Sequence, residues 1–187
     1  MKILPWAGDS IFPALCETLL AWRKSAPDTR DLPWRDEPTP YHVWISEIML
    51  QQTRAAVVRG YYLRFLDALP TVRDLAAVDD DALMKLWQGL GYYSRARNLK
   101  RAAQAIVTDH GGELPSDFDA LLALPGIGRY TASAIASFAY GEPRPAVDGN
   151  FLRVAARVTA NGIDIAKDTT KRALESALAP SYPGGRG

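Results

Sequence analysis

Apolar residues recur every three or four positions along most of this chain, which is the spacing of one face of an α-helix. On this basis we predict helices over 12–24, 43–66, 79–86, 95–110, 131–140, 150–160 and 169–178, with shorter ones after Thr71 and before Leu124. No segment alternates apolar and polar residues for long enough to predict a β-strand. The pattern therefore predicts an all-α protein.

Polar residues and glycines mark several of the expected helix ends. Thr71 followed by Asp74 matches a capping box in which aspartate replaces the usual glutamate or glutamine. Ser116 is expected to cap the helix that ends near Leu124. The long pattern over 43–66 is expected to break near Gly60, because glycine disfavours a helix interior.

Composition restricts the class of protein only broadly. The chain has 187 residues, of which 48% are hydrophobic and 23% charged, as in ordinary globular proteins. The single cysteine, Cys16, excludes an internal disulfide or a multi-cysteine metal site within these residues. With no secretory signal and no apolar run of transmembrane length, we expect a soluble, reducing compartment.

The charge is unevenly distributed, although the net charge is only +1. Residues 1–90 hold 10 basic and 12 acidic side chains, whereas residues 91–187 hold 12 basic and 9 acidic ones. The run 94–101 carries four positive charges and no negative one. Such a run is usually a solvated helix face, but beside a phosphate-binding loop it would contact a nucleic-acid backbone.

Two short segments carry the strongest functional signal. The sequence Leu-Pro-Gly-Ile-Gly at 124–128 predicts a tight hairpin between helices, where Gly126 and Gly128 leave backbone N–H groups open to a phosphate. The sequence Val-Asp-Gly-Asn at 147–150 places Asp148 just before a helix. A phosphate-binding hairpin together with a fixed carboxylate indicates chemistry on DNA.

Two carboxylates are candidates for that chemistry. Glu47 has almost entirely apolar or neutral neighbours, so desolvation should raise its pKa and suit it to general acid catalysis; the alternative is an exposed glutamate on a polar helix face. Asp148 is either a helix N-cap or a permanent anion, and both roles can hold together. A protonated and an ionised carboxyl group are typical of glycosidic bond cleavage.

Five segments resemble a known family in order and approximate spacing: Leu-Pro-Trp-Arg at 32–35, and the stretches 40–53, 87–98, 124–128 and 146–150. They resemble the MutY-type adenine DNA glycosylases, which belong to the helix-hairpin-helix DNA glycosylases. The resemblance runs from about residue 30 to residue 158. It implies a monofunctional enzyme that hydrolyses the N-glycosidic bond of adenine opposite 8-oxoguanine or guanine in duplex DNA.

The resemblance also implies residue roles. Glu47 would protonate adenine at N7 and assist the attacking water, and Asp148 would stabilise the sugar cation with support from Asn150 and Tyr130. Because the target base must leave the stack, some residues would line the pocket that receives it, and others would enter the duplex around the opposing base. The walls of the adenine pocket would be Arg30, Leu32 and Trp34, and the residues entering the duplex would be Gln51, Gln52 and Tyr92. Without the resemblance, the two glutamines read equally well as an ordinary polar helix face.

The implied architecture has two helical subdomains with the active cleft between them. Residues 35–142 would form a helical barrel with the hairpin, and residues 1–34 with 143–187 would form the second subdomain. Family members carry a 4Fe-4S cluster on four cysteines, and a domain that recognises 8-oxoguanine, beyond the point matching residue 187. We therefore expect a fragment that binds no cofactor itself, acts as a monomer on duplex DNA, and works in the bacterial cytoplasm at the nucleoid.

Two alternatives stay open. An endonuclease III-type enzyme would excise oxidised pyrimidines and cut the strand through a lysine Schiff base. That lysine is expected at the position of Tyr130, and none lies between Arg101 and Lys167. A non-catalytic helix-hairpin-helix DNA-binding module is the other alternative, but it would not need the carboxylate pair.

Overall fold

The computed structural model describes residues 11–25 and 32–182, and this part of the chain is helical without a strand. The prediction of an all-α protein is confirmed. The chain divides into two compact units, one of residues 32–140 and one that combines residues 1–31 with residues 141–187. Each unit has its own hydrophobic core.

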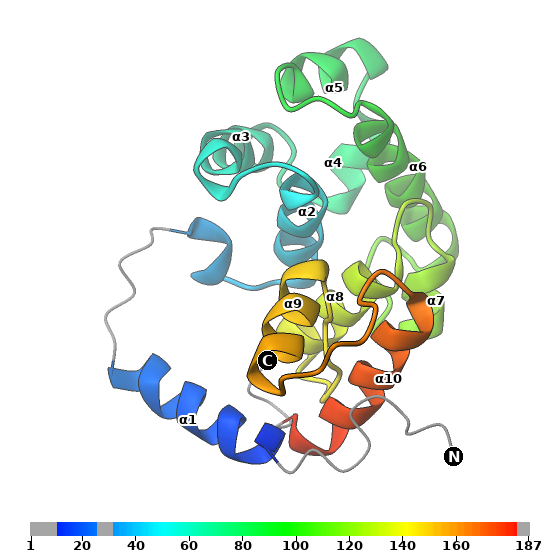
Figure 1. Ribbon diagram of the computed structural model, residues 1–187. Helices are drawn as coiled ribbons and strands as arrows, with labels where there is room; N and C mark the ends of the chain where they lie inside the picture. The colour runs from blue at the N-terminus through cyan, green and yellow to red at the C-terminus, as the bar shows by residue number, and fades with distance from the viewer. Residues whose placement is uncertain (1–10, 26–31, 183–187) are drawn as a thin grey trace. The chain divides into compact units, whose positions relative to one another are not determined.

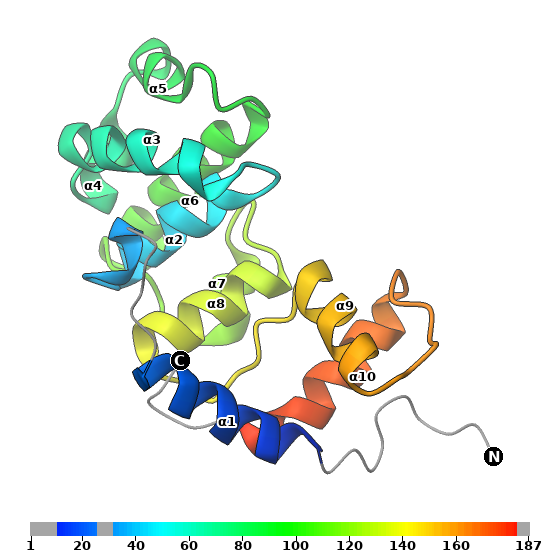
Figure 2. The same ribbon diagram turned by 60° about the vertical axis from the view of Figure 1, so that its left-hand side comes forward.

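The unit of residues 32–140 contains seven α-helices and one 3-10 helix among its residues (Figures 1 and 2). In chain order they are η1 (Pro33–Arg35), α2 (Pro40–Leu50), α3 (Ala55–Ala68), α4 (Val72–Ala77), α5 (Asp80–Trp87), α6 (Ser94–Asp109), α7 (Phe118–Ala123) and α8 (Arg129–Tyr140).

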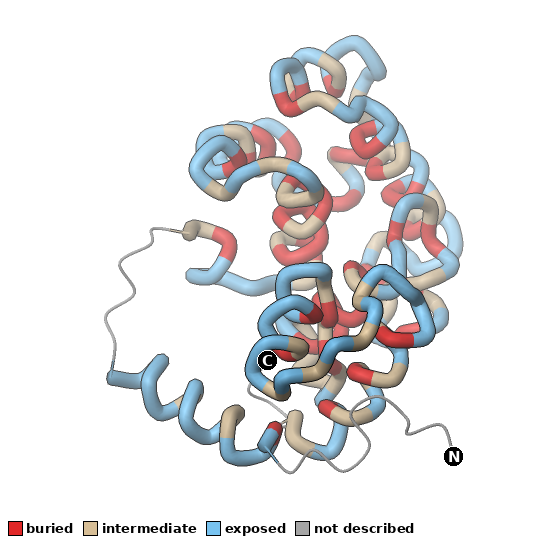
Figure 3. The backbone as a smooth tube through the Cα atoms, in the orientation of Figure 1, coloured by how far each residue is buried: buried red, intermediate tan, exposed pale blue. Residues whose placement is uncertain are grey.

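Helix α2 is central to this unit, because it packs against α3, α6 and α8. It begins with Pro40 in its first turn, where the missing N–H costs no hydrogen bond. The Thr39 hydroxyl caps it by accepting the His42 N–H at 3.2 Å. Most of α2 is buried, as Figure 3 shows in red. The helix that carries Glu47 is therefore held on several sides.

Two predicted helix boundaries are wrong. The pattern over 43–66 breaks at residues 51–54, between α2 and α3, and not near Gly60, which lies inside α3. The cap of α7 is Asp117, whose carboxylate accepts the Ala120 N–H at 2.8 Å, and not Ser116. The capping box of Thr71 and Asp74 at the start of α4 is confirmed.

The second unit contains α1 (Ile11–Ser25), α9 (Gly149–Val158), α10 (Asp168–Leu178) and the 3-10 helix η2 (Ala179–Ser181). Among its described residues, the buried members of the hydrophobic core are Phe12, Val147, Leu152, Ala155, Leu174 and Leu178. One face of α9 leaves Phe151, Val154 and Val158 exposed. Across residues 11–25 and 32–182, none of the helices combines the length and apolarity needed to cross a membrane.

Candidate functional site

Glu47 lies in the third turn of α2 and is partly buried. Its chain neighbours Ser46 and Ile48 are 2% and 3% exposed, whereas Glu47 itself is of intermediate burial. The Ser46 hydroxyl donates to the Val43 carbonyl at 2.9 Å. Glu47 is thus not one of the fully exposed glutamates that the alternative interpretation describes.

Asp148 is the N-cap of α9. Its Oδ1 accepts the Phe151 N–H at 2.7 Å, and its Oδ2 accepts the Asn150 side-chain amide at 3.3 Å. The Asn150 side-chain Oδ1 in turn accepts from the Arg153 guanidinium at 3.0 Å. The hydrogen bonds from Phe151 and Asn150 fix the position of the Asp148 carboxylate at the start of α9. The sequence interpretation missed Arg153, although it stands three residues after Asn150 and therefore on the same helix face.

The predicted hairpin between helices is confirmed, because residues 124–128 join α7 to α8 directly. Leu124 and Ile127 are 6% and 4% exposed, and the Ile127 N–H donates to the Leu124 carbonyl at 3.2 Å. These two residues anchor the turn, whereas Gly126 and Gly128 are exposed. Within residues 11–25 and 32–182, no backbone carbonyl accepts the N–H of either glycine. Both N–H groups can therefore bind a phosphate oxygen.

The residues expected to enter a duplex lie on two loops of the unit 32–140. Gln51 and Gln52 follow the end of α2, and Tyr92 lies between α5 and α6. Gln52 and Tyr92 have φ values of 56° and 48°, a left-handed conformation that residues with a Cβ rarely adopt. The Tyr92 ring is 61% exposed. Such strain persists only where the surroundings enforce it.

Arg95 differs from both interpretations of the basic run, because it faces the protein interior. Its side chain is 8% exposed, and its guanidinium donates to main-chain carbonyls rather than to solvent or DNA. Of the other cations in the run, Lys100 pairs with Asp80, whereas Arg97 and Arg101 are exposed. The solvated-face and DNA-contact interpretations are therefore wrong for Arg95.

The structure describes two of the three residues expected to form the adenine pocket. Arg30 lies outside the described residues. Leu32 is partly buried against the core of the unit 32–140, and Trp34 is 8% exposed with its ring edge-on to Tyr62 at 5.7 Å. Tyr130, which is expected to support Asp148, is the second residue of α8; it is partly buried and has an interaction partner.

The residues of this chain do not fit an iron–sulfur cluster. A cubane cluster of this type takes four cysteine thiolates, and Cys16 is the single cysteine of the sequence. In the described part of the chain, no three histidine, cysteine or acidic side chains gather at a metal-binding distance.

Comparisons with known proteins place these features in a family. The sequence of human adenine DNA glycosylase is 43% identical over 170 residues, covering 88% of this chain but only 30% of that protein. The fold resembles a thermostable thymine-DNA glycosylase, with a TM-score of 0.82, 30% identity and coverage of 94% and 80% of the two chains. It also resembles endonuclease III in a non-covalent complex with DNA, with a TM-score of 0.74, 26% identity and coverage of 93% and 79%.

The resemblance predicted from the five segments is thus confirmed by adenine DNA glycosylases that are 38% to 43% identical to this chain over most of its length. Residues 45–180, which include Glu47, the hairpin and Asp148, match the model of one protein family. The chain belongs to the HhH-GPD superfamily of base excision DNA repair proteins.

Proposed function

We propose that this chain excises adenine from duplex DNA by hydrolysing its N-glycosidic bond, with adenine opposite 8-oxoguanine or guanine as the substrate. One observation carries the proposal. The 43% identity to an adenine DNA glycosylase extends over 88% of the chain, a stretch that must include both Glu47 and Asp148. The environments of these two carboxyl groups support the chemistry.

The two carboxyl groups divide the reaction. Breaking an N-glycosidic bond leaves an electron-deficient sugar and an anionic base, so the base must gain a proton and the sugar must face an anion. Glu47, partly buried on α2, is the proton donor to adenine N7 and then assists the attacking water. Asp148, held by the Phe151 N–H and the Asn150 amide, stabilises the cationic sugar. No step needs a cofactor.

The hairpin and the two loops supply DNA binding. Gly126 and Gly128 hold one phosphate through backbone N–H groups, a contact that is independent of base sequence. Gln51, Gln52 and Tyr92 enter the stack around the base opposite adenine. Tyr130 and Asn150 support the catalytic carboxylates, and Arg30, Leu32 and Trp34 help form the adenine pocket. We also propose that the protein, acting on DNA, works at the nucleoid of a bacterial cell.

The structural likeness to endonuclease III makes a lyase the main alternative. A lyase forms a Schiff base from an amine, and residue 130 is tyrosine, with no lysine between residues 101 and 167. Borohydride trapping separates the two activities. We expect no trapped protein–DNA adduct with either adenine or oxidised-pyrimidine substrates.

A substrate panel tests the proposal. Duplexes with adenine opposite 8-oxoguanine, adenine opposite guanine, and an oxidised pyrimidine opposite guanine are incubated with excess protein, and alkali then reveals abasic sites. We expect cleavage after alkali for the first two only. Excision of the pyrimidine, or strand cleavage without alkali, would overturn the assignment.

A further inference from the structure

Arg95 connects two loops that are distant in sequence. Its Nη1 lies 2.8, 2.9 and 2.8 Å from the carbonyl oxygens of Ile48, Met49 and Gln51, at the end of α2. These carbonyls have no partner within their own helix, because a helix leaves its last four acceptors unpaired. The buried cation therefore ends α2 where the residues expected to enter DNA begin.

The other terminal nitrogen of Arg95 binds the second loop. Its Nη2 donates to the carbonyls of Leu90 and Gly91 at 3.0 and 3.2 Å, and contacts the Thr53 hydroxyl at 3.3 Å. The guanidinium carbon also lies 5.6 Å from the Tyr92 ring centroid, within cation–π distance. One planar, five-donor side chain thus fixes both loops, which a lysine with its point charge cannot do equally well.

The loops held in this way are the strained ones. Gln52 and Tyr92 are two of only three non-glycine residues with positive φ in the part of the chain described. Each follows directly after a residue whose carbonyl accepts from Arg95, namely Gln51 and Gly91. We call the hydrogen bonds from Arg95 to these two loops the Arg95 clamp. The clamp acts on the peptide bonds that lead into Gln52 and Tyr92, the two left-handed residues.

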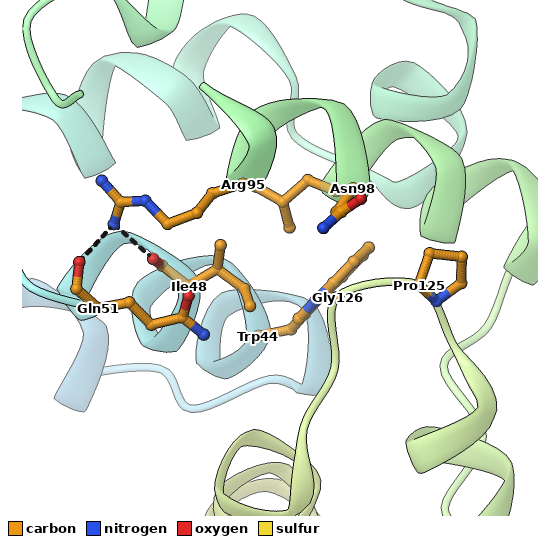
Figure 4. A pocket seen from close by; sticks show the side chains of 8 residues that line it. Trp44, Ile48, Gln51, Arg95, Asn98, Pro125 and Gly126 are labelled. Carbon is orange, nitrogen blue, oxygen red and sulfur yellow. Dashed lines mark hydrogen bonds between the residues drawn. The ribbon is translucent and has the colours of Figure 1, made fainter. Parts of the chain in front are cut away.

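The clamp also lies beside the phosphate-binding hairpin. A small pocket is lined by residues of α2, α6 and the hairpin, among them Gln51, Arg95, Asn98, Pro125 and Gly126. Figure 4 shows the Arg95 guanidinium bonded to Ile48 and Gln51 on the side of the pocket away from Pro125 and Gly126. The loop that follows α2 and the hairpin therefore border the same pocket.

We propose that Arg95 is a positioning residue that locks the loops of Gln52 and Tyr92 into one preformed ridge, so that entry into the duplex needs no reordering of either loop. The inference rests on the proposed function for its DNA readout. A preformed ridge avoids the entropy of ordering loops on binding. Loss of Arg95 should consequently weaken recognition of the mispair far more than general attachment to DNA.

The test compares Arg95→Met, which keeps length but removes charge, with Arg95→Lys and with Arg101→Met, an exposed control on the same helix. Affinities for a duplex with adenine opposite 8-oxoguanine and for an undamaged duplex are measured by anisotropy. We expect Arg95→Met to lower the ratio of the two affinities at least tenfold while changing the undamaged-duplex affinity less than threefold. Arg95→Lys should fall between it and the parent, and Arg101→Met should leave the ratio unchanged.

Hydrogen exchange on the free proteins supplies a readout that does not depend on DNA. Arg95→Met should lose protection at residues 51–53 and 89–93 and keep it in the body of α8. Uniform loss of protection, or parallel loss of both affinities, would show a merely structural role and overturn the inference. If Arg95→Met does not fold, Arg95→Lys serves for both measurements.

The failure of the proposed function has a different signature. If the parent protein itself shows no preference for the mispaired duplex, the proposed function fails, and hydrogen exchange alone decides the role of Arg95. Equal protection of the two loops in parent and variant would then contradict the clamp.

Discussion

Substitutions at the two hairpin glycines, Gly126 and Gly128, can be compared directly, because the sites are two residues apart but have different surroundings. A Cβ added at Gly126 would lie 2.7 Å from the Asn98 Cβ, and the residue has a φ of +77°. The Asn98 Cβ is fixed by the backbone of α6, so no side-chain rotation relieves the contact. A Cβ at Gly128 would meet nothing within 4 Å, and its φ is not positive.

These differences set the expected magnitudes. Gly126→Ala should cost roughly 1–2 kcal/mol for the left-handed conformation and roughly 1–3 kcal/mol for overpacking. Gly128→Ala should change the free energy of unfolding by less than about 1 kcal/mol, because alanine lowers the conformational entropy of the unfolded chain and does not strain the folded backbone. Denaturant unfolding of the two variants measures both values.

The substitution Gly128→Asp then isolates the phosphate contact. It fits sterically but brings a negative charge to about 5 Å from a bound phosphate, which is worth roughly 1–3 kcal/mol at dielectric constants between water and a protein surface. We expect about 5- to 150-fold weaker binding to every duplex alike, with the largest loss at low salt. Unchanged affinity at low and moderate salt would show that the hairpin does not contact the DNA backbone, and an undestabilised Gly126→Ala would refute its geometry.

Two further predictions concern stability. In the core of the second unit, Leu174→Ala should cost about 2–5 kcal/mol of unfolding free energy, whereas Val154→Ala on the exposed face of α9 should stay within about 0.5 kcal/mol; equal effects in thermal denaturation would contradict the assigned core. Burial, and then the charges of Glu37 and Asp36, raise the pKa of Tyr62 to about 12. Its neutral form therefore stabilises the fold fully below pH 10, and this contribution is lost as the pH rises to 12; Tyr62→Phe should flatten the decline in stability over that range, and an unaltered decline would argue against the assignment.

Local patterns predicted much of the structure. The capping box of Thr71 and Asp74 and the cap at Asp148 involve residues only three positions apart, so the sequence displays both partners together. The hairpin was equally visible, because Gly126 occupies a left-handed position that glycine favours. The error at Ser116 is a displacement by one residue between two neighbouring capping residues.

The break after α2 could not be predicted in the same way. It depends on Arg95, which stands 44 residues beyond Gln51 and takes up the terminal carbonyls of the helix. A signal was nevertheless present in α6, where Arg95 is in helical register with the buried Leu99, Ala102 and Ile106. Charge count alone placed it on the surface, whereas its position on the apolar stripe indicates burial.

In the proposed mechanism, Glu47 delivers the proton that releases adenine. The most direct test is single-turnover excision of adenine opposite 8-oxoguanine by the parent and by Glu47→Gln, with duplex affinity measured in parallel. The substitution keeps the shape of the side chain and removes the acidic proton, so general acid catalysis of about 10²- to 10⁴-fold should disappear while DNA binding stays within a few-fold of the parent. Excision by Glu47→Gln at a rate comparable to the parent would remove Glu47 from the mechanism.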